Sequence, residues 1–171
     1  SEGSPTSNYP LRGGKGFTYE GGIREPLIVR MSEMAVPGSI CDEVVISTDY
    51  YPTILQMTDS KMQPQQHLDG ISFLSLLNGK KKHLDRKVVY WHFPHYSNQG
   101  GRPSGVVRWS NYKLIEFYDT GEVELYDLSK DIAESHNLVE RHKKTAVRLL
   151  SDLRHWRAAV DATMPAVNPF S

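Results

Sequence analysis

The chain opens with a segment that has no regular alternation of apolar and polar positions. Residues 1–25 are rich in Gly, Ser, Pro and Asn, which is typical of loops. The apolar run from Pro26 to Ser32 follows and predicts a short buried strand over Pro26 to Met31. The loop therefore leads directly into the first expected element.

Two helices are expected after this strand. Residues 47–59 have apolar positions at helical spacing, Asp49 can cap the helix and Pro52 fits its first turn. Residues 69–83 predict a second, shorter helix that ends at Gly79. Residues 26–84 thus read as an α/β segment.

The pattern changes in the second half of the chain. Residues 86–93 predict a strand, and residues 105–128 predict three more strands with turns at Ser110-Asn111 and Asp119-Thr120-Gly121. Residues 140–162 predict a helix with one apolar stripe. This stripe is made of Ala146, Leu149, Leu150, Leu153, Trp156 and Val160.

The fold class that follows is α/β plus α+β, with an antiparallel sheet and a packed helix in the C-terminal part. The charge run over residues 79–87 marks the expected boundary, which gives segments 1–85 and 86–171. Five aromatic residues are expected in the sheet core, with a sugar-binding platform as the alternative: Tyr90, Trp91, Tyr112, Phe117 and Tyr126.

Composition excludes several classes of protein. Among 171 residues, 20 basic and 20 acidic side chains cancel, so no global field attracts the chain to nucleic acid or to a membrane. A hydrophobic content of 39% with 23% charged residues is typical of a folded globular chain. No apolar stretch approaches the ~20 residues that span a bilayer. The single cysteine, Cys41, is expected to be a small, partly buried residue.

The stretch from Leu11 to Pro26, LRGGKGFTYEGGIREP, carries the strongest candidate chemistry. Lys15 lies among glycines, but no Ser or Thr follows it and position 9 is Tyr, so a P-loop is excluded. A dinucleotide site is also excluded because the loop precedes the strand. Two readings stay open from the residues alone: a surface turn with Lys15 in water, or a loop that offers a compact charge to an anion. Glu20 and Arg24 are spaced to pair and stiffen the loop.

This stretch strongly resembles the sulfatase family, whose corresponding lysine contacts the sulfate group of the substrate. The resemblance continues in STDYYPTILQMTD, DGISFLSLLNGK, YWHFPHY and ELYDLSKDIAESHNL, with Ile132 where the family often has proline. It implies that residues 1–85 are the end of an alkaline-phosphatase-like α/β catalytic domain. Residues 86–171 would then be the small C-terminal subdomain, and Lys15 would be the catalytic residue.

The same resemblance identifies what the chain lacks. The family's nucleophile is a formylglycine made from Cys or Ser in Cys/Ser-x-Pro-x-Arg, and Cys41 stands in SICDEVV. The family's calcium ligands precede the glycine-lysine loop, so this chain is expected to hold no metal. The resemblance implies an exported, calcium-dependent parent enzyme that cleaves a sulfated small molecule or sulfated sugar. It also implies a missing N-terminal part, without which this chain should be inactive.

Three further residues are candidates for substrate binding. His92 and His95 flank Phe93-Pro94, and they are open to a packing role, a zinc pair without a third ligand, or contact with substrate. Arg102 lies in the glycine-rich loop after them, and it is either an exposed loop residue or a bidentate anion contact. Two alternatives to a sulfatase stay open: a non-catalytic accessory module with the same scaffold, and a related phosphatase or phosphodiesterase.

Overall fold

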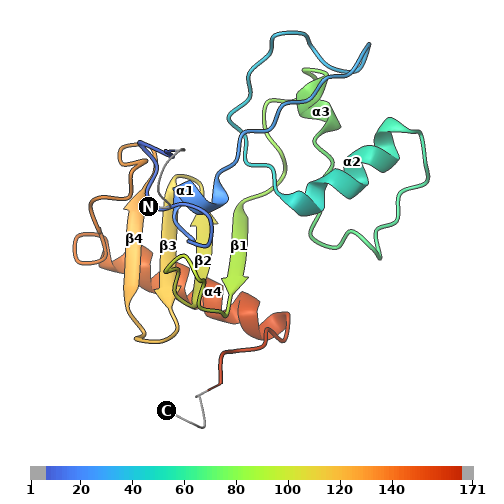
Figure 1. The fold of residues 1–171 in the computed structure, drawn as a ribbon. Helices are drawn as coiled ribbons and strands as arrows, with labels where there is room; N and C mark the ends of the chain where they lie inside the picture. Colours follow the sequence, from blue (N-terminus) through green and yellow to red (C-terminus); the bar gives the residue numbers. More distant parts are fainter. Residues whose placement is uncertain (1–6, 167–171) are drawn as a thin grey trace. The chain divides into compact units, whose positions relative to one another are not determined.

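The computed structural model describes residues 7–166 (Figure 1). In the second half of the chain, four strands are followed by one helix, in the order expected from the sequence. The elements are α1 (Glu20–Ile23), η1 (Ser47–Asp49), α2 (Tyr50–Met57), α3 (Leu74–Leu77), β1 (Val88–Phe93), β2 (Ser104–Trp109), β3 (Tyr112–Phe117), β4 (Val123–Asp127) and α4 (Lys143–Ala159). None of the helices in this described part has the length and apolar character needed to cross a membrane.

The chain divides into two compact units, and their composition differs from the expected segments 1–85 and 86–171. One unit comprises Leu27–Arg86. Within the described residues, the other unit combines the segment that ends at Pro26 with the segment that starts at Lys87. The glycine-lysine stretch therefore packs with the C-terminal sheet. Polar and ionic contacts between residues far apart in the chain hold this stretch against the sheet, and no local sequence pattern predicts them.

The C-terminal sheet has the order β1-β2-β3-β4, with every neighbouring pair antiparallel. The expected meander is thus confirmed. Ser110 has a φ of 52° in the turn between β2 and β3, and Gly121 has a φ of 72° in the turn between β3 and β4. Both expected turns therefore reverse the chain where polar and glycine residues interrupt the apolar pattern.

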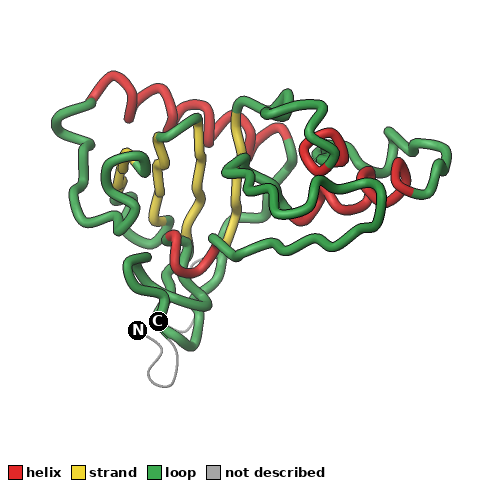
Figure 2. Tube along the Cα trace, turned by 90° about the horizontal axis from the view of Figure 1, so that it is seen from above, coloured by secondary structure: helices red, strands yellow, loops and turns green. Residues whose placement is uncertain are grey.

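Helix α4 covers one face of this sheet (Figure 2). The sheet contributes Val107, Leu114 and Leu125, and the helix contributes Ala146, Leu149 and Leu153. Trp156 stacks on Tyr90 of β1, with ring centroids 4.7 Å apart. The predicted apolar stripe is confirmed up to this residue, whereas Val160 lies beyond the helix and is exposed because α4 ends at Ala159.

Leu153→Ala should lower the free energy of unfolding by about 2–5 kcal/mol, because it leaves a cavity in a fully buried part of this core. The matched control on the same helix is Val147→Ala, since Val147 is 69% exposed. That change should stay within about 0.5 kcal/mol. Urea denaturation followed by tryptophan fluorescence measures both changes, and equal losses would contradict the placement of Leu153.

The opposite face of the sheet is covered by the N-terminal loop segment. Here Val106, Ile115, Phe117 and Tyr126 are buried, and Tyr19 packs against them. Because side chains alternate along a strand, Lys113 of β3 projects to this same face. The sheet therefore separates an apolar helix layer from a layer in which the glycine-lysine loop lies on buried polar groups.

The unit Leu27–Arg86 contains η1, α2 and α3 and is organised around Asp49. The Asp49 carboxylate accepts the Ile46 N–H at 2.8 Å from the third position of η1. It makes no cap hydrogen bond to α2, so the predicted N-cap role is not confirmed. It also accepts the Ile71 N–H at 2.8 Å and pairs with both terminal nitrogens of Arg86. Asp49 is fully buried, and this ion pair links the start of the helical segment to the end of the unit.

Three expectations for this unit are wrong. Pro26 to Met31 forms no strand and Ile28 is 92% exposed, because no described residues of the unit offer a partner strand for its backbone groups. The second helix is limited to α3, since residues 78–83 turn away in bends. Cys41 is exposed rather than partly buried, because it lies in the irregular segment before η1.

Candidate functional site

Lys15 lies on a compact loop whose two ends meet. The Gly21 N–H donates to the Arg12 carbonyl at 2.8 Å and closes the loop, and the Phe17 N–H donates to the Gly14 carbonyl at 3.0 Å inside it. Lys15 is exposed and makes no hydrogen bond or ion pair with any other described residue. Its ammonium group is therefore available to an anion.

Glycines make this loop possible in two ways. Gly13 and Gly16 have φ values of 71° and 89°, which disfavour residues with a side chain. A Cβ atom on Gly21 would collide with the backbone of Arg12 and Gly13, and one on Gly16 would collide with Ser97. The backbone on both sides of Lys15 is thus packed closely, and no side chain of its glycine neighbours shields the lysine.

The base of the loop is attached to the sheet through Arg12 and Tyr19. Nη1 of Arg12 donates to the Tyr126 hydroxyl at 2.8 Å and to the Glu134 carbonyl at 2.9 Å, and its guanidinium lies 3.8 Å from the centre of the Tyr19 ring. The Tyr19 hydroxyl donates to Glu124 at 2.9 Å. Burial and the neighbouring Glu124 carboxylate raise the pKa of Tyr19, so its hydroxyl keeps the proton that makes this bond.

A buried ionic cluster lies beside this base. Nζ of Lys113 is 2.9 Å from Oε1 of Glu20 and 2.8 Å from Oε1 of Glu134. Oε2 of Glu134 accepts the backbone N–H of Glu20 at 2.6 Å. The contact of Lys113 with Glu134 is an ion pair without hydrogen-bond alignment. All three side chains are at most 2% exposed, and burial raises the pKa of Glu134.

The pair expected between Glu20 and Arg24 is present, with 3.6 Å between Nη1 and Oε2. Arg24 is half exposed, and Glu20 has a closer cationic partner in Lys113. Spacing along the chain predicted Arg24 but could not find Lys113, which is 93 residues away. The loop is therefore held mainly by the sheet and only at its edge by Arg24.

The loop at residues 97–101 packs directly against the Lys15 loop. Its own turn is closed by the Ser97 N–H, which donates to the Gly101 carbonyl at 2.8 Å. A Cβ atom on Gly101 would collide with the carbonyl of Gly16, so this close approach requires glycine. The structure thus brings the segment after His95 beside the loop that carries Lys15.

His92 is engaged by the protein at both ring nitrogens. Nδ1 hydrogen bonds with the Tyr118 hydroxyl at 2.8 Å, and Nε2 donates to the Thr163 carbonyl at 2.9 Å. His95 is exposed, and its ring contacts Phe93 edge-on with centroids 5.8 Å apart. The two histidines therefore occupy different environments, and no cluster of three potential metal-ligating side chains is found within residues 7–166.

Arg102 is held by carboxylates. Its Nε and Nη2 atoms donate to the two carboxylate oxygens of Asp119 at 3.0 and 2.8 Å, and Nη1 donates to Glu122 at 3.3 Å. The guanidinium also lies over the Phe117 ring. These contacts fix the β3–β4 turn, and an incoming anion would have to displace them.

Arg102→Gln should raise the pKa of Asp119 towards that of an ordinary aspartate. The pKa is lowered in the structure chiefly by the hydrogen bonds from Arg102. A lowered pKa contributes stability above the unfolded-state pKa, and this contribution is lost as pH falls through the folded-state value. The variant should therefore be less stable than wild type near neutral pH, and the difference should disappear in acid. NMR titration of the Asp119 carboxyl measures the shift. Glu122→Gln is the control and should leave the pKa low, and an unshifted pKa in Arg102→Gln would contradict the assignment.

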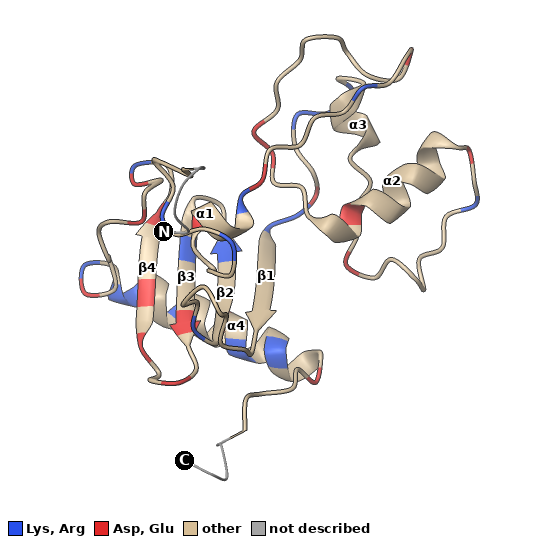
Figure 3. Cartoon of the chain, in the orientation of Figure 1, with Lys and Arg blue, Asp and Glu red and all other residues tan. Residues whose placement is uncertain are grey.

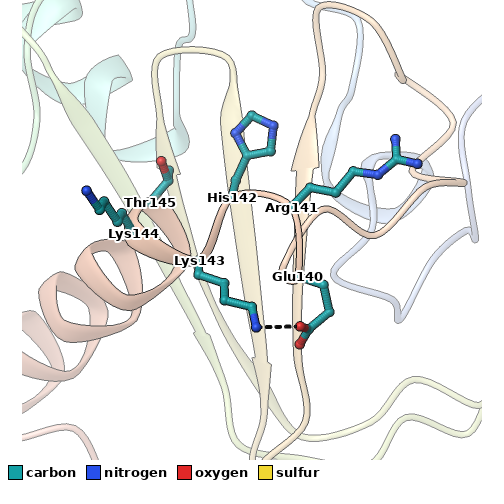
Figure 4. Close-up of a pocket in the computed structure, with 6 residues that line it drawn as sticks. All are labelled: Glu140, Arg141, His142, Lys143, Lys144 and Thr145. Atoms are coloured by element: carbon teal, nitrogen blue, oxygen red, sulfur yellow. Dashed lines mark ion pairs between the residues drawn. The ribbon is translucent and has the colours of Figure 1, made fainter.

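A shallow pocket lies elsewhere, at the start of α4 (Figure 4). It is lined by Glu140, Arg141, His142, Lys143, Lys144 and Thr145. Lys143 pairs with Glu140 at 2.9 Å, and basic residues continue along the helix (Figure 3). None of the lining residues was a predicted site residue, and this pocket does not include Lys15.

Sequence reasoning missed the residues that hold the loop, although the motif around Glu134 was a signal for one of them. Glu134 lies in ELYDLSKDIAESHNL, a segment used only for its resemblance to the sulfatase family. In the same segment Asn137 accepts the Leu125 N–H at 3.1 Å, and Asp131 accepts the His136 N–H at 2.8 Å. The motif thus builds the turn that presents Glu134 to the loop.

Comparisons with known proteins agree with this arrangement. Residues 14–158 match the family model described as N-sulphoglucosamine sulphohydrolase, C-terminal. A sulfatase from Formosa agariphila is 34% identical over 166 residues, which cover 89% of this chain and 30% of that protein.

Two solved structures superpose on most of this chain. Ps i-CgsB in complex with k-i-k-neocarrahexaose superposes with a TM-score of 0.70 at 25% identity, over 88% of this chain and 32% of that one. BT4656, in complex with its substrate D-glucosamine-2-N,6-O-disulfate, superposes with a TM-score of 0.56 at 27% identity, over 68% of this chain and 24% of that one.

The chain spans about a third or less of the length of these relatives. What it matches is their C-terminal region, in which the four-stranded antiparallel sheet and its helices are part of an alkaline-phosphatase-like sulfatase structure. The family model covers most of the chain, including the loop from Gly14 onward. The chain therefore belongs to the sulfatase family, as part of its C-terminal region.

Proposed function

We propose that the protein containing this chain is a sulfuric ester hydrolase that acts on a sulfated carbohydrate, and that Lys15 binds the sulfate group. The observation that carries the proposal is the exposed Lys15 ammonium on a closed glycine loop, in a chain of the sulfatase family. An ammonium group is a compact charge that suits a sulfate oxygen. Its neighbours Gly14 and Gly16 leave the approach open to an anion.

Lys15 would contribute to catalysis by electrostatics. Cleavage of the S–O bond places extra negative charge on the leaving oxygen and the sulfuryl group. A fixed cation that faces these oxygens stabilises the transition state more than the ground state. The closed loop and its attachment at Arg12 and Glu20 would keep the cation in place without reorganisation.

The nucleophile and the calcium ion of the reaction are proposed to come from the rest of the protein. Within residues 7–166 no three His, Cys, Asp or Glu side chains come together, so this part does not fit a calcium site. Cys41 is exposed in SICDEVV, outside the motif that formylglycine formation needs. We therefore assign this chain the sulfate-binding role and expect it to be inactive alone.

A sugar substrate is supported by one solved relative and by the description of the matching family. BT4656 has the substrate D-glucosamine-2-N,6-O-disulfate, and the matching family is described by a sulphoglucosamine sulphohydrolase. His95 is the proposed sugar contact in this chain, because it is exposed and lies two residues before Ser97, which is packed against Gly16. His92 and Arg102 would need to exchange their present partners before they could bind substrate.

The test is sulfate release from sulfated sugars, D-glucosamine-2-N,6-O-disulfate among them, by the full-length protein and by the isolated chain. Ion chromatography measures the sulfate. The full-length protein should release sulfate from at least one sugar of the panel, and the isolated chain should release none. A full-length protein that binds these sugars without releasing sulfate would instead be an accessory module, and turnover by the isolated chain would overturn the missing-nucleophile argument.

A further inference from the structure

Both ends of the Lys15 loop are held by one residue, Glu134. At the first end, Arg12 donates from Nη1 to the Glu134 backbone carbonyl at 2.9 Å. At the second end, the Glu20 N–H donates to the Glu134 carboxylate at 2.6 Å. Between these points, the bond from Gly21 N–H to the Arg12 carbonyl closes the loop. Glu134 therefore fixes the base on which Lys15 is carried.

Glu134 is itself held rigidly. Its side chain is fully buried, its φ of 50° is uncommon for a glutamate, and its N–H donates to the Asp131 carbonyl at 3.1 Å. Lys113, the second residue of β3, lies 2.8 Å from its carboxylate. A continuous path of contacts thus runs from the sheet through Lys113 and Glu134 to both ends of the loop.

Stability alone does not account for this cluster. Two carboxylates and one ammonium are removed from water here, and replacing such buried ion pairs by apolar residues is often neutral or stabilising. What ionic groups provide that apolar groups do not is directional contact. The directional contacts of this cluster are the hydrogen bond from Lys113 to the Glu20 carboxylate and the one from the Glu20 N–H to the Glu134 carboxylate. Both are made at one end of the loop that carries Lys15.

We propose that Glu134 is a positioning residue for Lys15: it fixes both ends of the loop so that the Lys15 ammonium stays at the sulfate-binding position. This inference rests on the proposed function, because it requires Lys15 to bind the sulfate group. Glu134 does not touch substrate, and its effect on the reaction passes through Lys15.

The matched control is Glu116, which lies on β3 and on the face opposite to Lys113. Glu116 is also a buried glutamate, and it accepts from Arg154 and Arg157 of α4 at 2.9 Å each. Glu116→Gln therefore removes the same charge at a similar burial without touching the loop. Glu134→Gln keeps the volume of the side chain, but its single amide oxygen cannot serve both Lys113 and the Glu20 N–H.

The experiment is a double-mutant cycle in the full-length protein. Glu134→Gln and Glu116→Gln are each made in the wild-type protein and in the Lys15→Ala variant. For every protein, kcat/KM is measured for an aryl sulfate. Hydrogen exchange of the peptide covering residues 12–24 is measured in the same proteins. If Glu134→Gln does not fold, Arg12→Gln takes its place, because it breaks the contact at the other end of the loop.

Glu134→Gln should reduce kcat/KM by about 10–100-fold when Lys15 is present, since a displacement of about 1 Å can cost this much. In the Lys15→Ala background, Glu134→Gln should reduce kcat/KM by less than about 2-fold, because Glu134 acts through Lys15. Exchange at residues 12–24 should become faster in Glu134→Gln and stay unchanged in Glu116→Gln.

Equal fold losses in both backgrounds would overturn the proposal, and so would unchanged exchange in Glu134→Gln. The failure of the proposed function gives a different result, because the wild-type protein would then hydrolyse no aryl sulfate, or Lys15→Ala would have the wild-type rate. In either case hydrogen exchange still tests the structural part of the proposal: faster exchange confined to residues 12–24 in Glu134→Gln shows that Glu134 holds the loop, and unchanged exchange overturns this part too.

Discussion

Replacing Lys15 by alanine in the full-length protein is expected to lower kcat by about 10²–10³-fold, which corresponds to the loss of one preorganised electrostatic donor. In the proposed site the charge would face the sulfate in the ground state and in the transition state, so KM should rise as well. The fold should be unaffected, because the side chain is exposed and makes no polar contact with another described residue. Steady-state hydrolysis of an aryl sulfate measures the effect.

Two controls sharpen this prediction. Lys15→Arg keeps the charge but replaces a compact ammonium by a longer, planar guanidinium, and it should restore little activity. Lys144→Ala removes another exposed lysine, at the start of α4, and should leave kcat unchanged. A wild-type kcat in Lys15→Ala, with circular dichroism unchanged, would remove Lys15 from the site.

Lys113→Met should lower the free energy of unfolding by about 3–5 kcal/mol, the usual cost of removing one partner from a buried pair. The methionine fills a similar volume, so the loss comes from the two glutamates that remain buried without their cation. Lys130→Met is the control, because Lys130 is 83% exposed where it pairs with Asp127. That change should cost about 1 kcal/mol or less.

The cost of Lys113→Met should depend on pH. Burial raises the pKa of Glu134, so its contribution to stability is present below the unfolded-state pKa and is lost as pH rises through the raised value. Without Lys113 the carboxylate form is still less favourable, and the variant should lose more stability at pH 8 than at pH 5. Urea denaturation at both values measures this difference. Equal losses at the two pH values would show that the charges are not what stabilises the cluster.

The sequence predicted well the strands, turns and helix that are determined by the local pattern of apolar, polar and turn-forming residues. The meander follows from alternating strands and from turns at Ser110-Asn111 and Asp119-Gly121, and α4 follows from an apolar stripe at helical spacing. The pair Glu20 and Arg24 was also accessible, because four residues separate its members. The loop around Lys15 was predicted from its glycines, and the role of Lys15 in sulfate binding stays a prediction.

The parts that sequence could not predict depend on distant contacts. Pro26 to Met31 has the composition of a strand, but a strand exists only with a hydrogen-bonded neighbour. Lys113 lies within the apolar pattern of YKLIEF, where a lysine is expected at the surface, because lysines are almost never fully buried unless paired. Its partners are 93 and 21 positions away along the chain, so only the folded structure shows the cluster.

The central claim is that the full-length protein cleaves sulfate esters with the help of the loop that carries Lys15. The most direct test compares hydrolysis of 4-nitrophenyl sulfate and 4-nitrophenyl phosphate by the same full-length preparation, read from the release of 4-nitrophenol. We predict hydrolysis of the sulfate ester, with a higher kcat/KM than for the phosphate ester. Hydrolysis of the phosphate ester alone would contradict the claim, and so would hydrolysis of neither ester by a preparation that also releases no sulfate from the sulfated sugars.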